Sequence, residues 1–182
     1  MPTDKYGNFS LMAEWTNILA YDLTSPSGVT YHLAGTHGPS GISGDTGNPR
    51  NRINGTLEWD DGPFTAVLTG YWISSYSATD PSAGAQGACS GAFNAALAFA
   101  GVTPSSINEK YCRVAGFSSV NLQAAYHVNP HLTVTFAVDN IADANAPIDA
   151  ETYGGSFVPV NPSMDEDGII GRFFRLGVTY KY

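Results

Sequence analysis

The sequence predicts an all-β chain, a segment of an antiparallel up-and-down transmembrane β-barrel with about six strands. Three observations support this class. Six segments alternate apolar with polar side chains, and the connections between them run long, short, long, short, long. Glycine and proline are frequent, at 20 and 11 residues, while only 13% of residues are charged, which is typical of many short strands joined by turns.

The first three predicted strands cover residues 9–21, 52–59 and 64–76. Because side chains on a strand point alternately to opposite faces, each of these segments would place its apolar residues on one face. The residues on that parity are Phe9, Leu11, Ala13, Trp15, Leu19 and Tyr21, then Ile53, Leu57 and Trp59, then Phe64, Ala66, Leu68 and Trp72. The sequence Asp60-Asp61-Gly62 predicts a tight turn that joins the second and third strands as a hairpin.

The next two predicted strands cover residues 119–128 and 131–139, and Asn129-Pro130 forms the turn between them. The apolar parity continues through both strands, at Val120, Leu122, Ala124, Tyr126 and Val128, then at Leu132, Val134, Phe136 and Val138. These two segments therefore predict a second hairpin.

The last predicted strand covers residues 172–182, and it has the clearest alternation in the chain. Its apolar face consists of Phe174, Leu176, Val178, Tyr180 and Tyr182. About ten alternating residues suffice for a tilted strand to cross a bilayer with its apolar face toward lipid. The last strand of a soluble β-sandwich can show the same alternation, so this strand alone leaves both classes open.

The lengths of the connections favour the barrel. Residues 24–49, 77–116 and 142–171 form three long connections, and the two short turns lie between them in the chain. In an outer-membrane barrel the short turns face the periplasm and the long loops face outside, whereas a sandwich has no reason to separate loops by length. Aromatic residues near strand ends would form the interfacial belts, at Phe9, Tyr21, Trp59, Phe64, Trp72, Tyr76, Tyr126, Phe174 and Tyr182. We therefore expect a chain in contact with lipid of the outer membrane of a Gram-negative bacterium, with its last strand ending in the periplasm.

Three stretches, residues 48–76, 132–147 and 170–182, resemble the carboxyl-terminal end of the barrel of TonB-dependent outer-membrane receptors. In that family the penultimate strand ends in Asn-(Leu or Ile)-x-Asp followed by Pro, and the corresponding residues here are Asn140, Ile141, Asp143 and Pro147. The last strand of the family begins with Gly-Arg and ends on an aromatic residue. Gly171, Arg172 and Tyr182 match this pattern.

The resemblance implies a barrel of twenty-two strands with a plug domain inside it, which imports iron chelates, vitamin B12, glycans or other scarce nutrients. It also implies contact with TonB through the plug, and with the barrel-assembly machinery, which reads the closing aromatic strand. This chain departs from the family because only six strands and no plug are found in residues 1–182. We therefore expect a partial barrel, the carboxyl-terminal part of a receptor for siderophores or other large nutrients, which does not transport alone.

The alternative hypothesis is a small free-standing barrel or a soluble β-sandwich that binds a ligand through its loops. Ligand contacts are expected in the three long connections under either hypothesis, although no residue pattern identifies them. In the barrel, the charged and amide side chains on the polar parity would face the lumen and could touch the plug. They are Glu14, Arg52, Glu58, Gln123, Arg175 and Lys181.

Cys89 and Cys112 are the only cysteines, and both fall in the second long connection. An outer loop lies in an oxidising environment, which favours a disulfide between them. A redox pair and two metal ligands are the other possibilities, but the spacing is neither Cys-x-x-Cys nor a zinc pattern with a nearby histidine.

No catalytic or metal centre is expected. The sequence contains no Gly-x-Ser-x-Gly elbow and no suggestive Ser, His and Asp set, so we do not expect an enzyme. The spacing of the four histidines does not suggest metal binding, because His127 and His131 lie beside a turn and His32 and His37 lie in a glycine-rich loop. No cofactor is expected. The acidic run Asp165-Glu166-Asp167-Gly168 lacks the twelve-residue calcium-loop spacing.

Net charge and apolar runs exclude two further classes. Eight basic and sixteen acidic residues give a formal net charge of -8, so no binding to nucleic acid is expected. No window of about twenty apolar residues exists for a transmembrane helix, and residues 1–6 do not begin a signal peptide. Solvent exposure is expected for the acidic residues of the connections, namely Asp45, Asp80, Glu109, Asp143, Asp149, Glu151, Asp165, Glu166 and Asp167.

Overall fold

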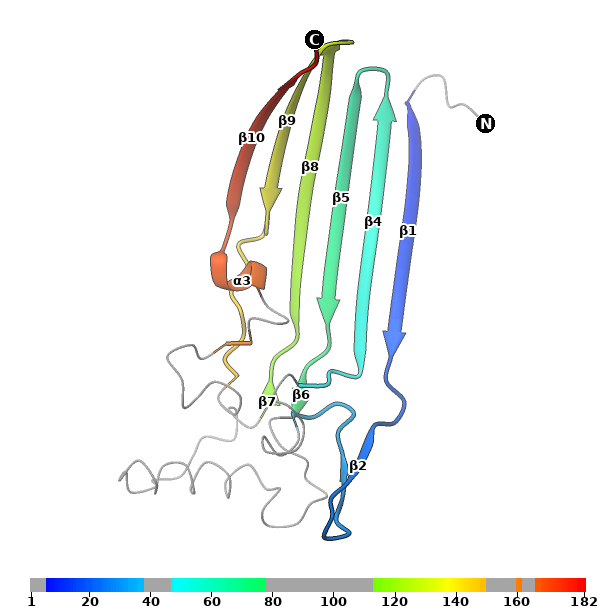
Figure 1. Cartoon of the computed structure of the whole chain (residues 1–182), viewed down its shortest axis with the longest axis vertical. Coiled ribbons are helices and arrows are strands. Elements are labelled where there is room, and N and C mark those ends of the chain that lie inside the picture. Colours follow the sequence, from blue (N-terminus) through cyan, green and yellow to red (C-terminus); the bar gives the residue numbers. More distant parts are fainter. Residues whose placement is uncertain (1–5, 38–46, 78–112, 150–159, 162–165) are drawn as a thin grey trace, which may run out of the picture.

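The structure is a computed structural model that describes residues 6–37, 47–77, 113–149, 160–161 and 166–182. Six long strands form one antiparallel sheet in the order β1-β4-β5-β8-β9-β10 (Figure 1). Their bounds are β1 Asn8–Asn17, β4 Asn51–Asp61, β5 Phe64–Ile73, β8 Phe117–Asn129, β9 Leu132–Asp139 and β10 Phe173–Tyr180. The predicted class of an antiparallel, up-and-down β-sheet segment with about six strands is confirmed. The sheet is not closed, since in the described residues the outer edges of β1 and β10 pair with no further strand.

The two tight turns and the long connections lie at opposite ends of the sheet. In Figure 1 the β4–β5 and β8–β9 turns lie at the top with the end of β10, and the short strands β2, β6 and β7 of the long connections lie at the bottom. We call these the turn end and the loop end. The β4–β5 turn consists of Gly62 and Pro63 rather than of the predicted Asp60-Asp61-Gly62, because Asp60 and Asp61 still pair with β5. Gly62 has the positive φ, 56°, that a two-residue hairpin turn favours at its first position.

Most predicted strand ends differ from the observed ones by one or two residues, and the first and third strands end three or four residues earlier than predicted. In both of these strands the reason is where the neighbouring strand ends. The first strand stops at Asn17 rather than at Tyr21, because β4 begins at Asn51, its partner. The third strand stops at Ile73, and Tyr76 lies instead in the short strand β6 (Tyr76–Ser77), which pairs with β7 (Arg113–Val114).

The connections contain short elements that the alternation did not predict. The first connection forms a hairpin of β2 (Asp22–Thr24) and β3 (Thr30–His32), and the third contains the short helix α3 (Glu166–Ile170). The β2–β3 turn is closed by hydrogen bonds between Ser25 and Val29, whose backbone and side-chain groups meet there. The turn needs no apolar face, so periodicity does not reveal it.

Buried apolar side chains cluster at the loop end. Ile73, Tyr76, Val114 and Phe117 pack together with at most 4% of each residue exposed. They come from the ends of β5 and β8 and from the β6–β7 pair. In the described residues the middle of the sheet is not covered by a second layer, so the long strands lie in one sheet rather than in two packed sheets (Figure 1).

Candidate functional site

One face of the sheet is continuously apolar, and we call it the apolar face. Cross-strand pairing places one residue from each strand in a single row, Leu11, Leu57, Leu68, Leu122, Val138 and Phe174. Leu11 and Leu176, on the two edge strands, each have 76% of their surface exposed. The exposed large residues on this face also include Phe9, Trp15, Ile53, Phe64, Trp72, Tyr126, Phe136, Val178 and Tyr180.

The area of the apolar face exceeds what soluble monomers usually expose. Six strands about 4.8 Å apart, with eight residue steps of about 3.3 Å from Phe64 to Trp72, give an area of roughly 750 Å². The largest apolar patch on a typical soluble monomer is about 300–600 Å². Such a surface is typical of one that meets an apolar partner.

Aromatic side chains lie at two levels of the apolar face. At the turn end the rings of Phe64 and Tyr126 stack with centroids 4.5 Å apart, and the Phe9 ring lies 6.4 Å from that of Trp59. Toward the loop end, Trp15 and Trp72 share one row through Ile53. All three tryptophans of the chain therefore lie on this face.

The predicted apolar side of the last strand lies on the same face. Phe174, Leu176, Val178 and Tyr180 pair with Val138, Phe136, Val134 and Leu132 of β9. Tyr182 follows the end of β10 and is fully exposed. The two strands thus form one apolar surface along the open edge of the sheet.

The opposite, polar face carries the side chains that were predicted to face a lumen. Glu58, Gln123 and Arg175 lie in one row across the sheet, through Val67 and Ala137. Glu14 and Arg52 lie on the same face nearer the loop end, and Lys181 follows the end of β10. Arg175 Nη2 forms an ion pair with Asp139 Oδ1 at 2.8 Å.

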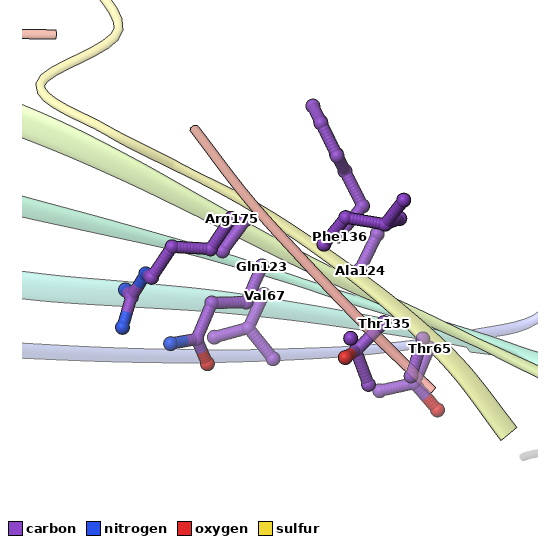
Figure 2. Close-up of a pocket in the computed structure, with 11 residues that line it drawn as sticks. Thr65, Val67, Gln123, Ala124, Thr135, Phe136 and Arg175 are labelled. Carbon is purple, nitrogen blue, oxygen red and sulfur yellow. The ribbon is translucent and has the colours of Figure 1, made fainter. Parts of the chain in front are cut away.

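A shallow recess of about 460 Å³ lies among β5, β8, β9 and β10. Figure 2 shows Arg175, Gln123, Val67, Thr135 and Thr65 on one side of the strands, and Phe136 and Ala124 on the other. Small side chains at Ala125, Ala137 and Gly177 also line it. The lining therefore combines small side chains with the Arg175 guanidinium and the Gln123 amide.

The loop end contains a cluster of buried polar residues that the sequence did not reveal. We call it the loop-end cluster, and it consists of His37, Tyr76, Asp149 and Asn161, each at most 1% exposed. The Tyr76 hydroxyl donates a hydrogen bond of 2.8 Å to Asp149 Oδ2, and His37 Nε2 lies 3.2 Å from the same oxygen. The expectation that Asp149 is solvated is wrong, because the three long connections meet around it.

A second set of polar residues links the end of β9 to α3 by hydrogen bonds. The buried Asn140, with φ of 50°, donates from Nδ2 to the carbonyls of Ala144 and Asp167, and its Oδ1 accepts from Ala144 N. Asp167 Oδ2 accepts hydrogen bonds from Ser119 Oγ and Asn121 Nδ2. The Asp167 carboxylate is therefore engaged with β8 rather than simply solvated, contrary to expectation.

Asp143 completes this arrangement, because its Oδ1 accepts a hydrogen bond from Arg172 N at the start of the last strand. The Asn-Ile-x-Asp run of the sequence thus has a local structural role. Asn140 closes the turn after β9, and Asp143 joins that turn to the segment before β10.

The other histidines lie apart from the loop-end cluster. His32 Nδ1 lies 2.7 Å from Asp22 Oδ1 in the β2–β3 hairpin. His127 and His131 lie at the turn end, where they bond to Thr133 Oγ1 and to the Lys181 carbonyl. Over the described ranges, no group of three or more His, Cys, Asp and Glu side chains gathers as metal ligands would.

Several predictions lie outside the described residues. Cys89 and Cys112 belong to this group, as do Asp45, Asp80, Glu109, Glu151 and Asp165. None of the helices in the described part of the chain is long and apolar enough to cross a membrane.

Comparison with known proteins finds likeness at the level of structure alone. No family model and no curated protein sequence matches the chain. Among solved structures, it is similar to the ferric enterobactin receptor PfeA of Pseudomonas aeruginosa in complex with BCV-L6, with 14% identity and a TM-score of 0.49 over 96% of this chain. It is also similar to the copper transporter OprC, with 16% identity and a TM-score of 0.48 over 97% of this chain. The chain spans about a fifth of the length of these proteins, 20% and 21% respectively.

Proposed function

We propose that this chain forms part of the wall of a transmembrane β-barrel. In this proposal it comprises the carboxyl-terminal strands of a TonB-dependent receptor in the outer membrane of a Gram-negative bacterium. One observation carries the proposal: six strands present a continuous apolar face, and the charged side chains of these strands lie on the opposite face, except Asp61 at the end of β4. A strand in a membrane barrel has this division, because lipid contacts one face and the aqueous lumen contacts the other. The sequence resemblance of three stretches to TonB-dependent receptors supports the family.

Strand length and aromatic positions fit the thickness of a bilayer. From Phe64 to Trp72 the strand rises roughly 26 Å, which corresponds to about 20 Å along the membrane normal at a tilt near 40°. The apolar band of outer-membrane barrels is about 25 Å tall and is flanked by aromatic belts. The tight turns would then face the periplasm and the long connections would face outside.

The open edges of β1 and β10 define the partners in this proposal. An edge left unpaired in hydrocarbon costs several kcal/mol for each unsatisfied backbone group. Both edges therefore require further strands, which the rest of the receptor barrel would supply. The chain alone would not transport, and the parent receptor would take up siderophores or other large nutrients.

The same proposal assigns roles to the polar face, the last strand and the cysteines. Glu58, Gln123 and Arg175, together with Glu14, Arg52 and Lys181, would face the lumen, and the recess beside Arg175 could contact the plug through which TonB acts. The last strand, with Phe174, Leu176, Val178, Tyr180 and Tyr182, would be read by the barrel-assembly machinery. A disulfide between Cys89 and Cys112 would close an outer loop. We assign the chain no catalytic activity.

Folding in detergent tests the proposal. We expect the purified chain to stay insoluble or aggregated in buffer, and to acquire strand structure with a heat-dependent shift in gel mobility when detergent is added. A cooperative, monomeric fold in buffer without detergent would overturn the proposal in favour of a soluble, loop-binding β-protein. The measurements are circular dichroism, gel mobility before and after boiling, and size-exclusion chromatography.

The tryptophans test which face meets detergent. Because Trp15, Trp59 and Trp72 all lie on the apolar face, a brominated detergent should quench most of the tryptophan fluorescence of the folded chain. The control replaces all three by Phe and introduces Thr56→Trp on the polar face, where quenching should be weak. Equal quenching of the two proteins would contradict the assignment of faces.

A further inference from the structure

A second recess lies on the polar face at the turn end, where the β8–β9 turn meets the end of β10. It has a volume of about 260 Å³, and we call it the turn-end recess. His127, Thr133 and Thr179 line it from one row of the polar face. His131 and Lys181 line its edge, where Lys181 N donates a hydrogen bond of 2.8 Å to the His131 carbonyl. Among the described residues, no carboxylate lines this recess.

Both histidine rings of the turn-end recess are held by one nitrogen and keep the other available. His127 Nδ1 lies 3.0 Å from Thr133 Oγ1, and His131 Nδ1 lies 2.9 Å from the Lys181 carbonyl oxygen. Because a carbonyl oxygen only accepts hydrogen bonds, His131 Nδ1 carries a proton in this arrangement. In the described part of the chain, neither ring's Nε2, nor Lys181 Nζ, nor Thr179 Oγ1 has a hydrogen-bond partner. Four unused polar groups therefore line one recess.

The charges around the turn-end recess favour an anion. Lys181 carries a positive charge, and histidine is the side chain that gains one as the pH falls from about 8 to about 5. The ion pairs found among the described residues involve His32, His37 and Arg175, so Lys181 has no acidic partner there. This lack of an acidic partner occurs in a chain with a formal net charge of -8. A cationic recess without its own carboxylate attracts an anion, whose binding offsets the repulsion among the cationic groups.

We propose that the turn-end recess binds an oxyanion of the phosphate or sulfate type. A lysine ammonium binds phosphate as a point charge, and hydroxyl and imidazole N–H groups donate hydrogen bonds to its oxygens. Four donors from β8, the β8–β9 turn and the end of β10 match an anion with three or four oxygens better than a carboxylate, which has two. Because the recess lies on the face opposite to the apolar one, the anion belongs to a soluble molecule rather than to a lipid headgroup. This choice of source rests on the proposed function, under which the turn end faces the periplasm, whereas the site itself does not.

Nuclear magnetic resonance of the histidine rings tests the site in the whole chain folded in detergent. The probe is sulfate, which keeps the same charge from about pH 5.5 to about pH 8, while histidine changes its charge in that range. We expect the ring signals of His127 and His131 to shift with sulfate, and those of His32 and His37 at the loop end to stay unchanged. The affinity should be about tenfold higher at the lower pH than at the higher pH, a difference of about 1.4 kcal/mol.

Variants matched in charge separate the site from a general attraction of anions. Lys181→Gln should weaken sulfate binding about tenfold, and Lys181→Arg should retain most of it. Arg50→Gln, which removes one charge at the loop end, should leave it unchanged.

Three outcomes would contradict the inference. Absence of the histidine shifts, or equal binding by Lys181→Gln and the wild type, would overturn the site. Displacement of sulfate by micellar phosphatidylglycerol but not by soluble phosphate would overturn the soluble source. A chain that folds only in detergent but binds no sulfate refutes the site alone, and a soluble monomer that binds sulfate refutes the proposed function alone.

Discussion

The middle of the sheet and its loop end distribute their side chains in opposite ways. In the middle, large apolar residues such as Leu11 and Leu176 are 76% exposed. At the loop end, Phe117 is 4% exposed and the polar side chains of His37 and Asp149 are fully buried. The loop end therefore resembles the core of a soluble protein, whereas the middle presents to its surroundings what a soluble protein hides. The two regions should respond differently to the same kind of substitution.

Removal of a large side chain at the loop end should have the largest effect. Phe117→Ala should lower the free energy of unfolding by about 3–5 kcal/mol, because it leaves a cavity among Ile73, Tyr76 and Val114. Leu176→Ala on β10 should lower it by less, about 1–2 kcal/mol, since the variant loses contact with hydrocarbon but leaves no cavity in the protein. Urea titration in detergent, followed by circular dichroism, measures both. Equal losses in the two variants would mean that the loop end is no better packed than the middle.

A charge should distinguish the two faces in the middle of the sheet. Leu68 and Thr69 are consecutive on β5, and Leu68 lies in the leucine row of the apolar face. If that face meets hydrocarbon, Leu68→Lys should cost about 2–4 kcal/mol. The matched variant Thr69→Lys on the polar face should stay within about 0.5 kcal/mol of the wild type. The same urea titration in detergent reports both values, and a reversed order would exchange the two faces.

The middle of the sheet could be predicted from the sequence because a strand's alternation is local. The pairing of Leu57 with Leu68, for example, follows from two alternating segments and the short turn between them. The parity of every strand and the separation of short from long connections follow in the same way. The tight turns lie slightly later in the chain than predicted, because Asp61 and Asn129 still belong to strands. The strand ends did not, because β1 ends where its neighbour β4 begins, which no local pattern records.

The loop end could not be predicted, because its contacts join residues that are distant in the sequence. Asp149 looks like any acidic residue in a polar loop until His37 and Tyr76 are placed beside it. In the sequence, the Asn-Ile-x-Asp run shows only a resemblance to a known family. Its role, in which Asn140 bonds to Ala144 and Asp167, required the position of α3.

Asn140 offers the smallest of the three effects and tests whether the loop end also sets where β9 ends. Asn140→Ala should cost about 1–3 kcal/mol, because it leaves buried partners of the amide unsatisfied. Asn140→Gly removes the same bonds but tolerates the positive φ of 50° without strain, so it should cost less than Asn140→Ala. Asn54→Ala, an exposed asparagine on the polar face, is the control and should have little effect. In Asn140→Ala, amide hydrogen exchange should become faster in residues 140–149 and in α3, while the middle of β9 stays protected. A loss of protection along the whole of β9 would show that the sheet depends on this turn.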